Sequence, residues 1–266
     1  MASLPGPVAT LTNKLRVPVR AAGLVGWTSV MLAGVESHKL VDRRLGAGAA
    51  QERIFDRYMR TWTGGLLKMF GVEVHLLGRL PPDPSGARMV VSNHRSALDI
   101  GVLLTHFGGS VLSRADLEHW PLLGLAAQKA QTIFVDREST QSGAQAIRAI
   151  RAQLERGRTV SVFAEGTTYA GDEVRPFNAG AFAAARKLGV EYVPVGLAYP
   201  PGCDYTEPTF VAHLGSVAER PRTPMVMAIG EPLQLDVRAN LVAARLHAEV
   251  QALVGRARAE LDRLTG

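Results

Sequence analysis

Short apolar runs alternate with longer amphipathic segments along most of this 266-residue chain. The short runs are rich in Val, Ile and Phe and have the length of buried strands, whereas the longer segments repeat apolar residues at helical spacing. Pro194 interrupts one run, which indicates an edge strand or a bulge there. Strands are predicted at 72–77, 89–91, 111–113, 132–135, 159–163, 192–197, 211–214 and 225–229, and helices at 50–70, 144–156, 179–188 and 241–264.

This alternation predicts an α/β fold with a mixed, largely parallel sheet flanked by helices. The chain is long enough to bury a full core as one large domain or as one domain with an appendage.

The N-terminal part has a different pattern, because residues 21–35 are fifteen consecutive uncharged residues. A bilayer-spanning helix needs roughly 20 apolar residues, so this segment is short for one. Three interpretations stay open: an interfacial or re-entrant helix, a short membrane span, and a buried core helix. Trp27 and the basic flanks favour attachment to a membrane. These flanking residues are Lys14, Arg16, Arg20, Lys39, Arg43 and Arg44.

Composition narrows the classes of function. The net charge of +6 fits a nucleic acid, an anionic membrane surface or an anionic substrate as partner. Aromatic residues make up only 6% of the chain and do not interleave with a basic patch, which disfavours nucleic-acid binding. Cys203 is the single cysteine, so an internal disulfide and a cysteine-based metal cluster are excluded. No histidine cluster has metal-ligand spacing and no dinucleotide fingerprint occurs, so neither a metal nor a cofactor is expected.

One strand end carries candidate chemistry. His94 follows the run at 89–91, and Ser96 offers an N-cap for a helix with Ile100, Leu103 and Leu104 in phase. Sites in α/β sheets lie outside such carboxyl ends of strands. A neutral imidazole can take a proton from an alcohol, and a carboxylate on its other nitrogen would fix the tautomer.

Asp99 can serve as that carboxylate if His94 precedes the helix and Asp99 lies in its first turn, because the two would not share a face of one regular helix. Ser96-x-x-Asp99 also resembles a capping box, in which Asp99 would serve the start of the helix. The two roles are compatible.

Two further strand ends carry polar residues. Asp136-Arg137 follows the strand at 132–135, and Glu165-Gly166-Thr167-Thr168 follows the strand at 159–163. Arg137 has the geometry to hold a phosphate, Gly166 allows close approach to the backbone, and the two threonines offer amides and hydroxyls to an anion. Taken singly, Arg137 also fits a surface ion pair and Glu165 a turn cap.

Together these segments resemble the motifs of a known family. Asn93-His94-x-x-x-x-Asp99 and then 133–137, 163–167 and 193–195 are similar, in order and separation, to the four motifs of the glycerolipid acyltransferases. The best-known members are the 1-acylglycerol-3-phosphate acyltransferases. The resemblance covers roughly residues 60–235, and the first and third motifs are the specific ones.

The resemblance implies a glycerol-3-phosphate acyltransferase-like fold with a membrane-associating helical region at 1–60 and an acyltransferase domain at 61–266. It implies acyl transfer from acyl-CoA or acyl carrier protein to a lysolipid hydroxyl, first of all that of 1-acyl-glycerol-3-phosphate, in phospholipid biosynthesis. The expected place is the cytoplasmic face of a bacterial inner membrane. No acyl-enzyme is needed, in keeping with the absence of a G-x-S-x-G elbow.

The resemblance also implies a role for each motif residue. His94 would be the general base and Asp99 its orienting partner. Arg114 resembles the basic position upstream of the second motif, and the loops of Arg137 and Glu165 would surround the acceptor head group. The expected substrate-binding residues are Asn93, Arg114, Arg137, Glu165, Gly166, Thr167 and Thr168.

Three positions depart from the family pattern: Ala164 replaces a proline, Thr168 an arginine, and Asn178 a frequent lysine. A phosphomonoester carries nearly two charges and favours several cations, of which Arg114, Arg137 and Arg175 remain here. An alternative acceptor is therefore a lysophospholipid with a larger head group or a lyso-ornithine lipid. A non-catalytic, membrane-associated lipid-binding protein is the alternative of a different class.

Overall fold

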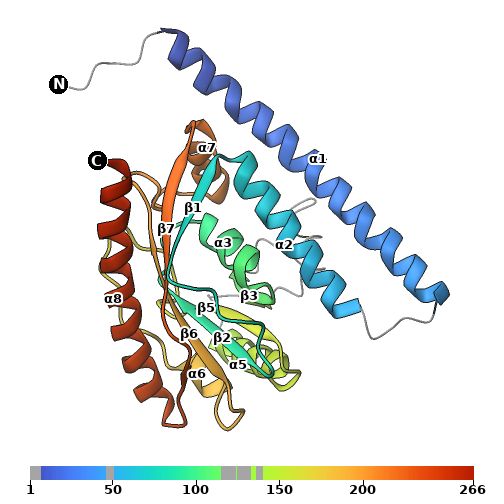
Figure 1. The fold of residues 1–266 in the computed structure, drawn as a ribbon, viewed down its shortest axis with the longest axis vertical. Helices are drawn as coiled ribbons and strands as arrows, with labels where there is room; N and C mark the ends of the chain where they lie inside the picture. Colours follow the sequence, from blue (N-terminus) through green and yellow to red (C-terminus); the bar gives the residue numbers. More distant parts are fainter. Residues whose placement is uncertain (1–6, 46–50, 115–123, 125–132, 136–139) are drawn as a thin grey trace.

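A mixed sheet carries the fold in the computed structural model, which describes residues 7–45, 51–114, 124, 133–135 and 140–266 (Figure 1). Its order is β1-β7-β6-β2-β5-β3-β4, with β8 paired to β6. Strands β2 to β6 are parallel and β7 runs against β6, which confirms the predicted mixed, largely parallel sheet. The strands are β1 Val72–Leu77, β2 Arg88–Ser92, β3 Ser110–Arg114, β4 Ile133–Val135, β5 Thr159–Phe163, β6 Glu191–Ala198, β7 Thr223–Ile229 and β8 Leu233–Gln234.

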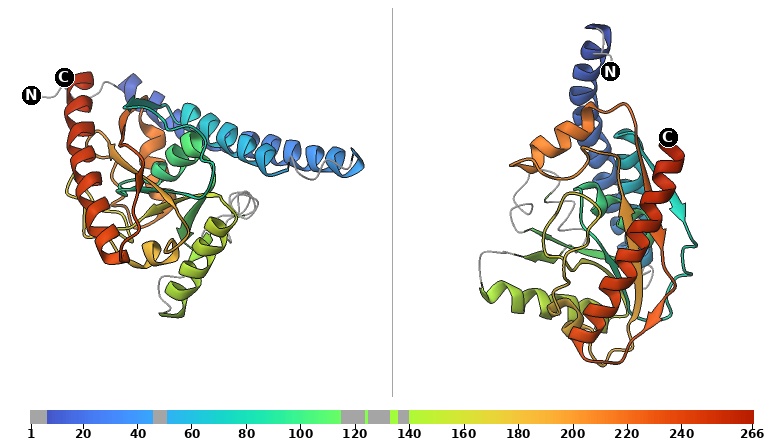
Figure 2. Two further views of the ribbon diagram at one scale, coloured as in Figure 1. Left: turned by 60° about the horizontal axis from the view of Figure 1, so that its bottom comes forward. Right: turned by 90° about the vertical axis from the view of Figure 1, so that its left-hand side faces the viewer.

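Helices cover both faces of this sheet (Figure 2). Residues of α5, α6 and α8 pack on one face, and residues of α2, α3 and α7 pack on the other. The described helices are α1 Pro7–Leu45, α2 Gln51–Met69, α3 Leu98–Phe107, α5 Thr140–Glu155, α6 Gly180–Ala184, α7 Phe210–Glu219 and α8 Ala239–Thr265.

Strand β2 lies in the middle of the sheet and is buried on both faces. Met89 and Val91 pack toward α5, α6 and α8, whereas Val90 packs toward α2 and α3. A parallel strand covered on both sides is expected to be a continuous apolar run, which is how this segment was recognised. Its carboxyl end therefore opens at one edge of a fully packed sheet.

One predicted strand is a helix, and one of the two interpretations of Pro194 is excluded. Residues 211–214 form part of α7, because the Thr209 hydroxyl caps the amide of Ala212 and the helix buries His213 and Val217 on one face. Strand β6 is not an edge strand, since it lies between β7 and β2. Pro194 is tolerated there because it stands where the neighbour of β6 changes from β8 to β7, so no ladder bond requires its missing N–H.

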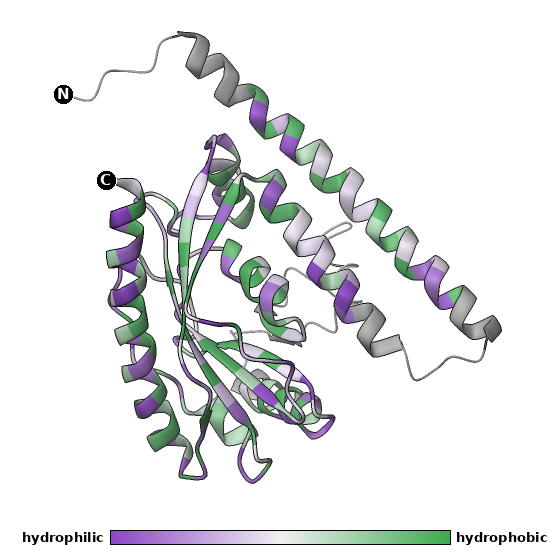
Figure 3. Ribbon diagram, viewed as in Figure 1, coloured by the Kyte–Doolittle hydropathy of each residue, from purple (hydrophilic) through white to green (hydrophobic). Residues whose placement is uncertain are grey.

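Helix α1 packs lengthwise against α2 and is apolar on two opposite sides. The inner side is buried and includes Met31 and Val35. The part of the chain that the structure describes holds one helix, Leu15–Leu40, long and apolar enough to cross a membrane. Only 11% of an apolar 18-residue stretch within it is buried, so it is not a core helix. Figure 3 shows few strongly polar positions along its middle. The outer side exposes Leu15 by 58%, Val19 by 69%, Val30 by 62% and Leu40 by 54%.

Each N-terminal helix contributes an arginine to the end of another helix. Arg60 of α2 donates to the carbonyl oxygens of His106 and Phe107 at the end of α3, at 2.5 and 2.7 Å. Arg20 of α1 donates to carbonyl oxygens at the end of α7, where chain carbonyls lack helical partners. Its acceptors are Ala218, Arg220 and Pro221. The proposed boundary between residues 60 and 61 falls inside α2.

Candidate active site

The loop that follows β2 begins with an asparagine that takes the place of a strand residue. The Asn93 Nδ2 donates to the Leu197 carbonyl at 2.9 Å, and its Oδ1 accepts from the Leu197 amide at 2.8 Å. The backbone ladder between β2 and β6 ends one step earlier, at Ser92 and Val195. The side chain thus continues the pairing while the backbone leaves the sheet. Both ends of the buried Asn93 amide are engaged, so the side chain shapes the loop.

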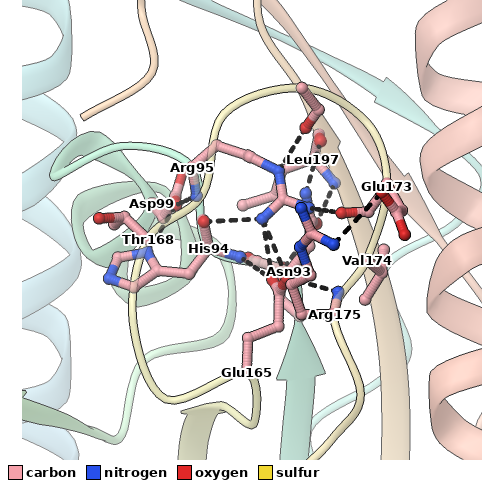
Figure 4. A network of polar contacts seen from close by, with 12 residues as sticks. Asn93, His94, Arg95, Asp99, Glu165, Thr168, Glu173, Val174, Arg175 and Leu197 are labelled. Carbon is pink, nitrogen blue, oxygen red and sulfur yellow. Dashed lines mark hydrogen bonds and ion pairs between the residues drawn. The ribbon is translucent and has the colours of Figure 1, made fainter. Parts of the chain in front are cut away.

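His94 and Asp99 lie together at this turn (Figure 4). The His94 Nδ1 is 2.8 Å from Asp99 Oδ2. The same oxygen accepts from the amides of Arg95 at 2.7 Å and Ser96 at 2.9 Å. Asp99 lies in the first turn of α3, and the residue before Leu98 makes no side-chain cap. One carboxylate oxygen therefore both orients the imidazole and caps the start of the helix, so the two predicted roles coexist.

The second oxygen of Asp99 has a partner from the residue that follows β6. The Tyr199 hydroxyl donates to Asp99 Oδ1 at 2.6 Å. Burial and the neighbouring Asp99 carboxylate raise the pKa of Tyr199 well above its usual value, so the hydroxyl keeps its proton and remains a donor. Asp99 is fully buried, and its two oxygens accept four hydrogen bonds in all.

The imidazole of His94 is held with one nitrogen available. Because a carboxylate only accepts hydrogen bonds, Nδ1 carries the proton and Nε2 of the neutral ring keeps its lone pair. The ring stacks on Phe163, with centroids 4.0 Å apart and an interplanar angle of 11°. Its side chain is 11% exposed. The lone pair of Nε2 therefore points away from the Asp99 carboxylate.

Glu165 joins the loop after β5 to the loop after β2. Its fully buried carboxylate is 2.9 Å from Arg95 Nη1 and accepts from the amides of His94 and Arg175, each at 2.8 Å. Arg95 also donates to the carbonyls of His94, Gly171 and Glu173. The Glu165 carboxylate therefore contacts the loop after β2 and does not face solvent. It holds the backbone of His94 in place.

The residues that follow Glu165 are more open to solvent. Gly166 is exposed and has φ +85°, a left-handed conformation that favours glycine, and a Cβ there would lie 3.0 Å from Asn178 Nδ2. Thr167 is exposed, and the half-buried Thr168 hydroxyl lies 3.5 Å from the Tyr205 carbonyl. These residues, unlike Glu165, leave groups available to a ligand.

Of the two remaining predicted residues, only one lies in the part of the chain that the structure describes. Arg114 ends β3, at the same sheet edge as His94, and Arg137 lies outside the described residues. Within the described ranges, no group of three or more His, Cys, Asp or Glu residues is arranged to hold a metal ion.

Sequence reasoning missed Arg95, Tyr199 and His213. Tyr199 follows the end of β6, so the strand-end rule marks its position but does not give Asp99 as its partner. The other two carry no signal in a single sequence, because only the fold brings their partners near.

Comparison with known proteins decides the family. A sequence model described as Acyltransferase matches residues 71–198. A lyso-ornithine lipid O-acyltransferase of Pseudomonas aeruginosa is 32% identical over 254 residues, which cover 92% of this chain and 96% of that protein. The chain belongs to the acyltransferase family. It is an enzyme, as the four motifs implied.

Two further comparisons bear on this acyltransferase. A 1-acyl-sn-glycerol-3-phosphate acyltransferase of Neisseria gonorrhoeae is 34% identical over 129 residues, covering 48% of this chain and 49% of that protein. The crystal structure of the 1-acyl-sn-glycerophosphate (LPA) acyltransferase PlsC from Thermotoga maritima superimposes with a TM-score of 0.73 at 18% identity, covering 94% and 98% of the two chains. The likeness to PlsC extends over the N-terminal helices as well and confirms the fold.

Proposed function

We propose that this acyltransferase moves an acyl group from a thioester to a hydroxyl of a lysolipid, with His94 as general base. The observation that carries the proposal is the His94 imidazole, whose Nδ1 is bound to the buried Asp99 and whose Nε2 keeps its lone pair. A general base needs such a lone pair within reach of the proton that it takes.

The chemical steps follow from that geometry. Nε2 takes the proton of the acceptor hydroxyl as its oxygen attacks the thioester carbonyl, and Asp99 stabilises the imidazolium that forms. The C–O bond forms, the C–S bond breaks, and the proton passes from the imidazolium to the departing thiolate. The products are an ester and a free thiol, so atoms and charges balance.

Direct transfer is favoured over an acyl-enzyme. The hydroxyls of Ser92 and Ser96, which flank His94, are fully buried and engaged with Asn93 and His213. Cys203 is fully buried as well. None of these candidate nucleophiles is placed to meet a thioester.

For the acceptor we propose a lyso-ornithine lipid. The relative that matches over nearly its whole length carries that name. Near Gly166 the side chains of Thr168 and Asn178 are neutral, and the exposed Arg175 is paired with Glu173 at 3.4 Å. A zwitterionic amino-acid head group needs less positive charge than a phosphomonoester. 1-Acyl-glycerol-3-phosphate is the second candidate, because the Neisseria relative named for it is 34% identical over 129 residues.

The membrane supplies this lipid, and we propose that the outer side of α1 contacts it. Leu15, Val19, Val30 and Leu40 are more than half exposed on that side. Burial of one such side chain contributes about 1.5–3 kcal/mol, and the basic flanks add attraction to anionic lipids. The cytoplasmic face fits both proposed donors, acyl-CoA and acyl carrier protein.

The test is acyl transfer by the purified full-length protein from labelled acyl-CoA and acyl carrier protein to a panel of lysolipids. His94→Ala should lower kcat about 10²–10⁴-fold. His106→Ala is the matched control, because the His106 imidazole bonds to the Val102 carbonyl of its own helix, and the variant should leave kcat near wild type.

Two results would contradict these proposals. A strong preference for 1-acyl-glycerol-3-phosphate would refute the lyso-ornithine assignment and support the second candidate. If neither the wild type nor His94→Ala transfers an acyl group to any acceptor, while both bind vesicles, the result would favour a lipid-binding protein.

A further inference from the structure

A second buried histidine, His213 of α7, contacts the loop between β2 and α3 (residues 93–97), which carries His94 and is called the catalytic loop below. The His213 Nε2 is 2.9 Å from the Ser96 hydroxyl and accepts from the Ala97 amide at 3.3 Å. Its Nδ1 is 3.0 Å from Glu207 Oε2. His213 and Ser96 are both fully buried, although more than a hundred residues separate them in the chain.

These contacts determine which ring nitrogen of His213 accepts and which donates. The Ala97 amide can only donate, so Nε2 must accept, and the proton of the neutral ring lies on Nδ1 and is donated to Glu207. Glu207 is itself held, because its other oxygen accepts from the Ser216 hydroxyl at 2.7 Å. Although burial opposes it, the hydrogen bonds from Ser216 and His213 hold the pKa of Glu207 below its usual value, so the acceptor stays charged.

The same segment of the catalytic loop is held at a further point. Tyr205 stacks on the His213 ring with centroids 4.6 Å apart, and its amide donates to the Arg95 carbonyl at 2.7 Å. Three consecutive residues, Arg95 to Ala97, are thus bound to α7 and the segment before it. Two of them, Arg95 and Ser96, supply the amides that bind Asp99 Oδ2.

We propose that Glu207 and His213 form a positioning unit for the catalytic pair. Through Ser96 and Ala97 they fix the backbone amides that hold the Asp99 carboxylate, and through Asp99 they fix the tautomer and orientation of His94. The mechanistic part of this inference rests on the proposed function, whereas the structural part does not.

Ser96, His213 and Glu207 have the order of a nucleophile, a base and a carboxylate. A nucleophilic role for Ser96 is ruled out by its place, since its hydroxyl is fully buried and directed at the imidazole. The unit acts on Asp99 through the Ser96 backbone instead.

The test compares variants that keep or remove the acceptor at Nε2. His213→Leu removes it, and His213→Gln returns an amide oxygen that can accept from Ser96 and Ala97. Glu207→Ala frees the ring to turn or change tautomer. Thr209→Ala is the matched control, because it removes the cap of α7 and leaves every contact of the positioning unit in place.

We expect His213→Leu to lower kcat about 10²-fold with KM unchanged, as for a small misplacement of a reacting group. His213→Gln should recover most of this loss, and Thr209→Ala should lower the melting temperature without changing kcat. If His213→Leu does not fold, the same comparison is made between Glu207→Ala and Thr209→Ala.

A second readout needs no turnover. In protein labelled with ¹⁵N-histidine, the imidazole signal of His94, assigned by its loss in His94→Ala, should show a protonated Nδ1 in wild type and in Thr209→Ala. In His213→Leu it should become an average of the two tautomers. A His94 signal and a kcat that both stay at wild-type values in His213→Leu would overturn the proposal. Absence of transfer by wild type would refute the proposed function alone, since the tautomer measurement still decides the positioning role.

Discussion

The loop that carries His94 and the helix α1 are built on opposite principles. Around His94, the side chains of Asn93, Asp99 and Glu165 are buried, and their oxygen and nitrogen atoms meet partners in the protein. On the outer side of α1, four large apolar side chains face outward and are at least 54% exposed. The loop thus depends on directional hydrogen bonds, whereas contact between α1 and a bilayer depends on apolar area, which has no direction.

This difference determines how each region responds to mutation. A buried polar network loses more than one bond when one partner is removed, because the group left behind stays desolvated. An apolar surface loses only the area of the side chain that changes. The loop should therefore respond sharply to isosteric changes, and α1 in proportion to the area removed.

The largest effect is expected at Asp99. Asp99→Asn keeps the shape of the side chain but removes the charge that fixes the His94 tautomer, so kcat should fall about 10²–10⁴-fold while vesicle binding is unchanged. Asp56→Asn is the matched control at the other end of α3, where Asp56 binds the Gly109 amide. Steady-state kinetics measure this, and a kcat near wild type for Asp99→Asn would refute the orienting role.

The next effect is on folding and separates buried from exposed charge pairs. Arg95→Met leaves the Glu165 carboxylate buried without its guanidinium, which should lower the free energy of unfolding by about 3–5 kcal/mol. Arg222→Met breaks the exposed pair with Glu73 and should change it little. Urea unfolding of both variants measures the difference. Equal losses would show that burial of the Arg95 pair is unimportant.

A smaller effect is expected from charges on α1. Val19→Asp and Val30→Asp should each weaken partition into vesicles by at least about tenfold, because burial of one Val contributes about 1.5–3 kcal/mol. The kcat for a short-chain, monomeric lysolipid should stay constant. Val237→Asp is the matched control, since Val237 is also exposed but lies next to α8. Vesicle flotation measures this binding. Equal binding by all three variants would refute the proposal that α1 contacts the membrane.

The smallest functional effect concerns Cys203. Burial raises the pKa of its thiol to about 11, so labelling by a thiol reagent at pH 8 should be far slower than in the unfolded chain. Since this value exceeds the ordinary 9.0, the thiol contributes stability that is complete below pH 9 and is lost as pH rises through 11.

A cysteine introduced on α1 gives the contrasting result. In a Cys203→Ser background, Val19→Cys should label fast in solution and slowly with vesicles present, whereas Cys203 of the wild type should be slow in both. If vesicles do not slow the labelling of Val19→Cys, the result would contradict the contact between α1 and lipid.

Much of the fold could be predicted from the sequence, because the strands of a buried parallel sheet are continuous apolar runs that stand out in the sequence. The pairing of His94 with Asp99 was also predictable, since both lie within one strand end and one helix start. Residues 211–214 resemble a strand in sequence because the segment begins with apolar and β-branched residues. The signal for a helix there is Thr209, which caps its first turn.

The rest of the site could not be predicted, because it joins distant parts of the chain. Tyr199 reaches Asp99 across 100 residues of sequence, and His213 reaches Ser96 across 117. Arg95 is adjacent to His94, but the direction of its side chain toward Glu165 depends on how β2 and β5 pair.

The arginines that α1 and α2 place on α7 and α3 have a practical consequence for shortened forms of this enzyme. A chain that begins at residue 51 would retain Arg60 but lose Arg20, and with it three bonds to the carbonyls of Ala218, Arg220 and Pro221. The end of the helix that carries His213 would then lose these partners, so a truncation made for solubility should also lower the stability of the fold. Replacing the outer side of α1 with polar residues, while keeping Arg20, is the better route to a soluble enzyme.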